Sequence, residues 1–61
     1  MEDALMTKGE VAKYLNVNLA TVRKLVKSGH LKEFGIGGTL RRYRRKDVDE
    51  MIDNLSKRRT D

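Results

Sequence analysis

Two segments that each carry helix start signals are joined by a link of only three residues, Asn16-Val17-Asn18. The first segment opens with Thr7, whose hydroxyl can cap free backbone N–H groups, and with Glu10, which can complete a capping box. The second segment opens with Asn18, a favoured N-cap residue. A link this short makes two helices meet at a sharp angle around a shared core, in a helix-turn-helix unit or an ordinary helical corner. We predict helices over residues 8–15 and 18–28.

Apolar side chains at helical spacing indicate which faces of the helices are buried. They are Val11, Tyr14 and Leu15 in the first helix, and Leu19, Val22, Leu25 and Val26 in the second. Gly29 is the residue type that commonly follows a helix in a left-handed conformation. A third amphipathic helix is predicted over residues 46–55, with Val48, Met51, Ile52 and Leu55 on its buried face.

A glycine-rich stretch separates the second helix from the third and predicts a β-hairpin. Three glycines lie between residues 35 and 38, where a hairpin tip needs positive φ angles. We expect strands over residues 31–35 and 40–44, which pack on the helices through Leu31, Phe34, Leu40 and Tyr43. The predicted fold class is therefore mostly α with a small β-hairpin. Residues 1–6 form a lead-in, residues 7–55 the domain and residues 56–61 a flexible basic tail.

The positive charge is concentrated in the middle of the chain, and the net charge is +5. Residues 18–46 contain nine Lys and Arg and only one acid, Glu33, whereas residues 47–55 contain four acids and no base. Such segregation favours a surface that faces a polyanion over a merely solvated charged chain.

Several function classes are disfavoured by the residues that the chain lacks. It contains no cysteine and a single histidine, His30, which we expect in a surface turn or at a phosphate. The glycine stretch lacks the Lys and Ser/Thr of a phosphate-binding loop. No apolar run approaches the ~18 residues of a membrane span. We therefore expect no catalysis, no metal, no cofactor and no membrane association, and a cytoplasmic, nucleoid-associated protein.

The polar face of the second helix is basic and suits the major groove of duplex DNA. Lys24 and Arg23 can reach guanine acceptors or phosphates, and hydroxyl groups can donate to phosphate oxygens. Its predicted DNA contacts are Asn18, Ala20, Thr21, Arg23, Lys24, Lys27 and Ser28. A solvated basic surface helix is the alternative.

The hairpin provides a second set of candidate DNA contacts, because arginine beside a narrow minor groove responds to its negative potential. Neighbouring residues of a strand face opposite ways, so Arg41 and Arg42 should not share a face. We expect Tyr43 in the core rather than stacked on a base. The predicted contacts of the hairpin are Gly37, Gly38, Thr39, Arg41, Arg42 and Arg44.

The chain resembles the small winged-helix proteins of the excisionase and MerR-like superfamily. The matching positions are Thr7, Glu10-Val11-Ala12, Leu15-Asn16-Val17, Thr21-Val22-Arg23-Lys24, Gly29-His30-Leu31, Gly37-Gly38, Arg41-Arg42-Tyr43 and Asp47-Val48. The resemblance implies a winged helix-turn-helix, with the recognition helix in the major groove and the hairpin, or wing, in the adjacent minor groove. Leu25, where an aromatic is common, and Gly9, where a better helix former is usual, depart from the pattern.

The resemblance also implies a range of functions. The favoured one is an excisionase-like architectural factor, which binds repeated sites beside further copies of itself, bends DNA and assists a recombinase. The alternative is a small MerR-like transcriptional regulator of a phage, plasmid or bacterium. No small-molecule effector is expected, because the effector domain of full MerR regulators is missing. Independently of the resemblance, the acidic third helix and the tail leave an RNA-binding or protein-interaction module as a third alternative.

Overall fold

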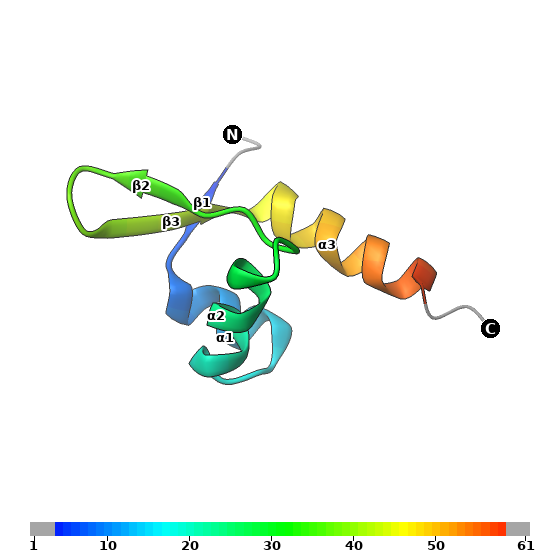
Figure 1. The fold of residues 1–61 in the computed structure, drawn as a ribbon. Coiled ribbons are helices and arrows are strands. Elements are labelled where there is room, and N and C mark those ends of the chain that lie inside the picture. Colours follow the sequence, from blue (N-terminus) through cyan, green and yellow to red (C-terminus); the bar gives the residue numbers. More distant parts are fainter. Residues whose placement is uncertain (1–3, 59–61) are drawn as a thin grey trace.

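The computed structural model describes residues 4–58 and contains three helices and a three-stranded antiparallel sheet (Figure 1). The elements follow the order β1 (Leu5–Met6), α1 (Lys8–Leu15), α2 (Leu19–Lys27), β2 (Phe34–Ile36), β3 (Leu40–Arg44) and α3 (Arg45–Arg58). This arrangement confirms the predicted fold class, a winged helix-turn-helix with the β2–β3 hairpin as its wing.

Local caps set both ends of α1 and the start of α2. Thr7 Oγ1 accepts a hydrogen bond from the Glu10 N–H at 3.1 Å, and Glu10 Oε1 accepts one from the Thr7 N–H at 2.9 Å. Asn16 then ends α1 in the left-handed conformation, with φ of 60°. Asn18 Oδ1 caps α2 by accepting from the Thr21 N–H at 2.9 Å. The predicted capping box and the short turn between the two helices are thus confirmed.

The sheet is ordered β1-β3-β2, so the central strand β3 carries the wing outward and ties it to the N-terminal part of the domain. In the wing, Phe34 pairs with Arg42, Gly35 with Arg41 and Ile36 with Leu40. The prediction of a strand from residue 31 was wrong, because β2 begins at Phe34 and Leu31 is instead buried in the core. The two-residue strand β1 lies in the predicted lead-in; it is too short to produce an alternating pattern.

The core is small and lies where α1, α2, β3 and α3 meet. It is formed by Val11, Ala12, Val22, Leu31, Tyr43, Val48 and Met51. Four residues predicted to face it are exposed instead: Tyr14, Leu19, Leu40 and Ile52. A chain of this size buries only part of each apolar stripe, so Leu19 and Leu40, the first residues of α2 and β3, stay at the surface.

Helix α3 begins directly after β3 and projects beyond the other elements (Figure 1). It extends past the predicted end at residue 55, so residues 56–58 of the predicted tail are helical. No glycine or proline interrupts that stretch. Residues 59–61 of the predicted tail and residues 1–3 of the predicted lead-in lie outside the described part of the chain.

Candidate nucleic-acid interface

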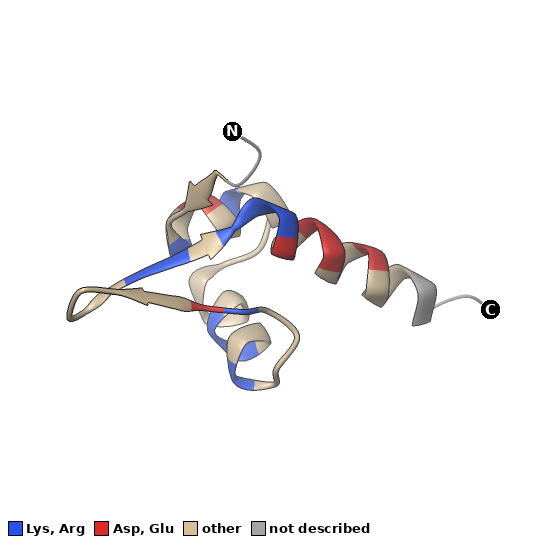
Figure 2. Cartoon of the chain, turned by 90° about the horizontal axis from the view of Figure 1, so that it is seen from above, with Lys and Arg blue, Asp and Glu red and all other residues tan. Residues whose placement is uncertain are grey.

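One side of α2 is buried and its other side is basic. Val22 is fully buried against the core, while Arg23, Lys24 and Lys27 are exposed. Ala20 and Ser28 are also exposed, and α2 contains no acid. Figure 2 shows Lys and Arg on α2, along β3 and at the beginning of α3, with Asp and Glu farther along α3. The exposed face of α2 is thus positively charged, as the helical spacing of its apolar and basic residues predicts.

The hydroxyl groups of α2 already donate hydrogen bonds within the helix. Thr21 Oγ1 donates to Asn18 Oδ1 at 2.9 Å, and Ser28 Oγ donates to the Leu25 carbonyl oxygen at 3.2 Å. Either hydroxyl would have to rotate away from this partner before it could donate to a phosphate. Arg23, Lys24 and Lys27 are therefore the stronger candidates for contact with an anion.

The tip of the wing is a turn over residues 37–39 that stands clear of the rest of the domain. Gly37 and Gly38 adopt φ angles of 55° and 68°, which disfavour side chains. No heavy atom beyond the chain neighbours lies within 4 Å of the position that a Cβ would take at either glycine. Backbone at this tip, together with the exposed Thr39, can approach a bound molecule closely.

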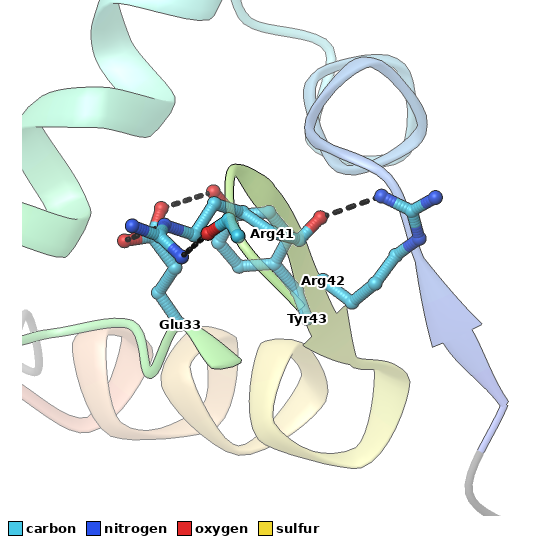
Figure 3. Close-up of polar contacts among 5 residues, drawn as sticks. Glu33, Arg41, Arg42 and Tyr43 are labelled. Carbon is cyan, nitrogen blue, oxygen red and sulfur yellow. Dashed lines mark hydrogen bonds and ion pairs between the residues drawn. The ribbon is translucent and has the colours of Figure 1, made fainter. Parts of the chain in front are cut away.

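Arg41 is half-exposed, and its guanidinium lies toward Glu33 beside the wing (Figure 3). Its Nη1 donates to the Gly38 carbonyl oxygen at 3.3 Å, and its Nε lies 3.8 Å from Glu33 Oε1. A Cβ on the cross-strand partner Gly35 would come within 2.7 Å of Arg41 Nη1. Because Gly35 has no side chain, the Arg41 guanidinium has room to lie there and to hydrogen-bond the turn at Gly38.

Arg42 and Arg44 lie on the other face of β3, as strand alternation predicts. Arg42 Nη1 donates to the Arg41 carbonyl oxygen at 2.8 Å, and its side chain points away from that of Arg41 (Figure 3). The Arg44 guanidinium lies 4.5 Å from the centroid of the Phe34 ring, a cation–π contact that holds it against the wing. The structure thus places the three wing arginines around the hairpin and not on one surface.

Glu33 is a residue of the site that the sequence reasoning missed. Its Oε2 accepts a hydrogen bond of 2.6 Å from the hydroxyl of Tyr43, which is fully buried as the sequence predicts for a core residue. Burial, and then the hydrogen bond with Glu33, raise the pKa of Tyr43 to about 12. The one signal in the sequence was that Glu33 is the only acid among nine bases in residues 18–46.

A second polar cluster joins α1 to the start of α3. Tyr14 Oη donates to Asp49 Oδ1 at 2.6 Å, and the Arg45 guanidinium lies 5.2 Å from the centroid of the Tyr14 ring. These contacts explain why Tyr14 is exposed: its hydroxyl bridges two helices at the surface. The contact with Tyr14 also holds the side chain of Arg45, the residue that follows β3.

His30 is exposed in the turn after α2, where Gly29 adopts the expected positive φ of 86°. Across residues 4–58, no three His, Cys, Asp or Glu side chains gather in a way that could hold a metal ion. None of the helices that the structure describes has the length and apolar character needed to cross a bilayer.

A capped helix pair with a short turn, a basic second helix and a hairpin that follows it define a winged helix-turn-helix. The sequence profile of a family described as a helix-turn-helix domain matches residues 5–56. The chain belongs to this family of small DNA-binding domains, which is related to the excisionases. No curated protein sequence matches the chain.

Proposed function

We propose that this protein binds duplex DNA at specific sequences as an excisionase-like architectural factor, with α2 in the major groove and the wing in the adjacent minor groove. The observation that supports this most is the exposed face of α2, where Arg23, Lys24 and Lys27 point outward from a helix without acids. An α-helix fits the major groove of B-DNA, which is about 12 Å wide.

The roles of the side chains follow from their reach and chemistry. Lys24 and Arg23, near the middle of α2, can donate to the O6 and N7 acceptors of guanine, which gives sequence discrimination. Lys27, nearer the end of the helix, suits a phosphate contact, which gives affinity and register. Arg41 and Arg42 contact phosphates on either side of the wing once the tip lies along the minor groove.

The acidic residues support one orientation on DNA. Asp49, Glu50 and Asp53 lie on α3, which projects away from α2 and the wing (Figures 1 and 2). A docked duplex would be attracted to the α2 and wing side and repelled from α3. In the architectural function, copies that bind adjacent repeats bend the DNA and so help a recombinase to assemble its complex.

Footprinting on the DNA that flanks the encoding gene tests the function. Protection of clustered repeats near an attachment site would support the architectural role, and protection of a promoter alone would contradict it in favour of transcriptional regulation. A competition between duplex DNA and duplex RNA of the same sequence is the control. Since a helix enters the deep, narrow major groove of RNA poorly, RNA should compete weakly. Equal competition would indicate a nonspecific polyanion binder.

A further inference from the structure

The wing ends in two aliphatic side chains that the rest of the chain leaves exposed. Ile36 is the last residue of β2 and Leu40 the first of β3, and the two are paired across the hairpin on either side of the turn. Their exposed fractions are 41% and 51%. Two unburied aliphatic residues side by side at the end of a projecting hairpin form a small apolar surface that a bound molecule can cover.

The position of this pair is well defined. Strand pairing fixes Ile36 opposite Leu40, and Arg41 braces the turn from the other face through Gly38 and Glu33. Gly37 and Gly38 contribute no side chains in front of the pair. The aliphatic pair is therefore the foremost apolar group of the hairpin, with only the backbone turn and Thr39 beyond it.

The charges behind the pair indicate what covers it. Arg42 follows Leu40 on the same face of β3, and Arg41 lies behind the turn on the opposite face. The nearest acid along the wing, Glu33, is engaged by Tyr43 and Arg41 at the base of the hairpin. An apolar tip with cationic groups behind it complements a partner whose rim is anionic and whose interior is apolar, which describes a groove of duplex DNA between its phosphates.

We propose that Ile36 and Leu40 form a wedge that enters the minor groove and partly unstacks a base step, so that the wing bends the duplex. This proposal rests on the proposed binding of duplex DNA. The strands of a hairpin lie about 4.8 Å apart before side chains are added, whereas the minor groove is only about 6 Å wide. Entry of both side chains therefore requires the groove to widen, and widening with unstacking kinks DNA toward the major groove. Flexible pyrimidine–purine steps should be preferred.

The test uses duplexes that the wild-type protein selects from random-sequence DNA, with 2-aminopurine at successive steps and dyes at the two ends. The wild-type protein should raise the 2-aminopurine fluorescence at one step and shorten the end-to-end distance. Ile36→Ser and Leu40→Ser should each abolish most of the fluorescence increase and at least halve the bend angle at saturating protein. Their affinity for the selected duplex should fall about tenfold.

Leu5→Ser is the matched control, because Leu5 has an exposed fraction of 49% but lies in β1, away from the tip. It should leave bending and fluorescence unchanged. Circular dichroism of each variant establishes that the domain is folded. If the tip variants bend and unstack the duplex like the wild-type protein, the wedge is refuted while DNA binding stands.

Two further outcomes are also decisive. If Ile36→Ser and Leu40→Ser lost a self-association that the wild-type protein shows in sedimentation experiments but still bent DNA, the pair would contact a second copy of the chain. That result would overturn the wedge. Absence of any duplex selection by the wild-type protein would overturn the proposed function itself, and with it the wedge.

Discussion

The carboxylate of Glu33 joins the hydrophobic core to the wing through Tyr43. One carboxylate oxygen accepts the hydrogen bond of the buried Tyr43 hydroxyl at 2.6 Å, and the other lies 3.8 Å from Arg41 Nε. Arg41 in turn bonds the backbone of the turn at Gly38. A single acid within the basic segment therefore positions the wing relative to the helices.

Tyr43→Phe should destabilise the domain by about 1–2 kcal/mol, because it removes a hydrogen bond to a carboxylate and leaves Glu33 without its buried donor. Chemical denaturation measures the loss. Tyr14→Phe is the matched control: it deletes a hydroxyl that bonds Asp49 at the exposed surface, so its cost should be smaller. Equal losses for the two variants would contradict a special role for the Tyr43–Glu33 bond.

The stability of the domain should fall as the pH rises from 10 to about 12. The pKa of Tyr43 is raised from 10.0 to about 12 in the folded protein, so in this window the unfolded chain loses the phenolic proton and the folded one keeps it. The unfolded state then binds fewer protons, and unfolding becomes easier by up to about 2–3 kcal/mol. Below pH 10, Tyr43 is protonated in both states and does not make the stability depend on pH. Denaturation curves of the wild-type protein and Tyr43→Phe should converge across this window; parallel curves would contradict the raised pKa.

Gly35→Ala should displace Arg41 without unfolding the domain. The added Cβ would come within 2.7 Å of Arg41 Nη1, the far end of a flexible side chain that can move at little cost to stability. DNA affinity should fall severalfold because the turn loses its brace. A double-mutant cycle with Arg41→Ala measures the coupling: in the Arg41→Ala background the glycine substitution should have little further effect.

Lys24→Ala should lower the discrimination between a selected duplex and random DNA by about 1–3 kcal/mol, because in the proposed function Lys24 contacts a base edge. Competition binding with both duplexes measures it. Lys13→Ala removes an exposed charge from α1, away from the basic face of α2, and serves as the control. An equal loss on every sequence would show that Lys24 only contacts phosphate.

The affinity for duplex DNA should fall steeply with salt, with a log–log slope of about −0.9 for each phosphate contacted. Arg41→Ala and Arg42→Ala should each make the slope shallower by about one contact while the thermal transition stays cooperative. Titrations at several salt concentrations provide the slopes. A flat salt response of the wild-type protein would contradict the phosphate contacts, and collapse of the transition in either variant would identify that arginine as structural.

The features that the sequence predicted well are those that depend on near neighbours. The caps join residues three positions apart, Thr7 with Glu10 and Asn18 with Thr21. These groups come within hydrogen-bonding distance as soon as the first turn of the helix forms. The basic face of α2 follows from helical periodicity once Val22 is buried. The opposite directions of Arg41 and Arg42 follow from the alternation of a strand.

The tertiary structure decided which of these residues are covered and which are held in place. Leu19 and Leu40 fit the apolar pattern but lie beyond the edge of a small core, and β1 forms only because β3 offers a free edge. Glu33 accepts from Tyr43 and lies close to Arg41 because the register that pairs Phe34 with Arg42 brings Glu33 beside Tyr43. Periodicity along a chain determines the direction of a side chain, whereas burial and pairing depend on distances between segments that only packing brings together.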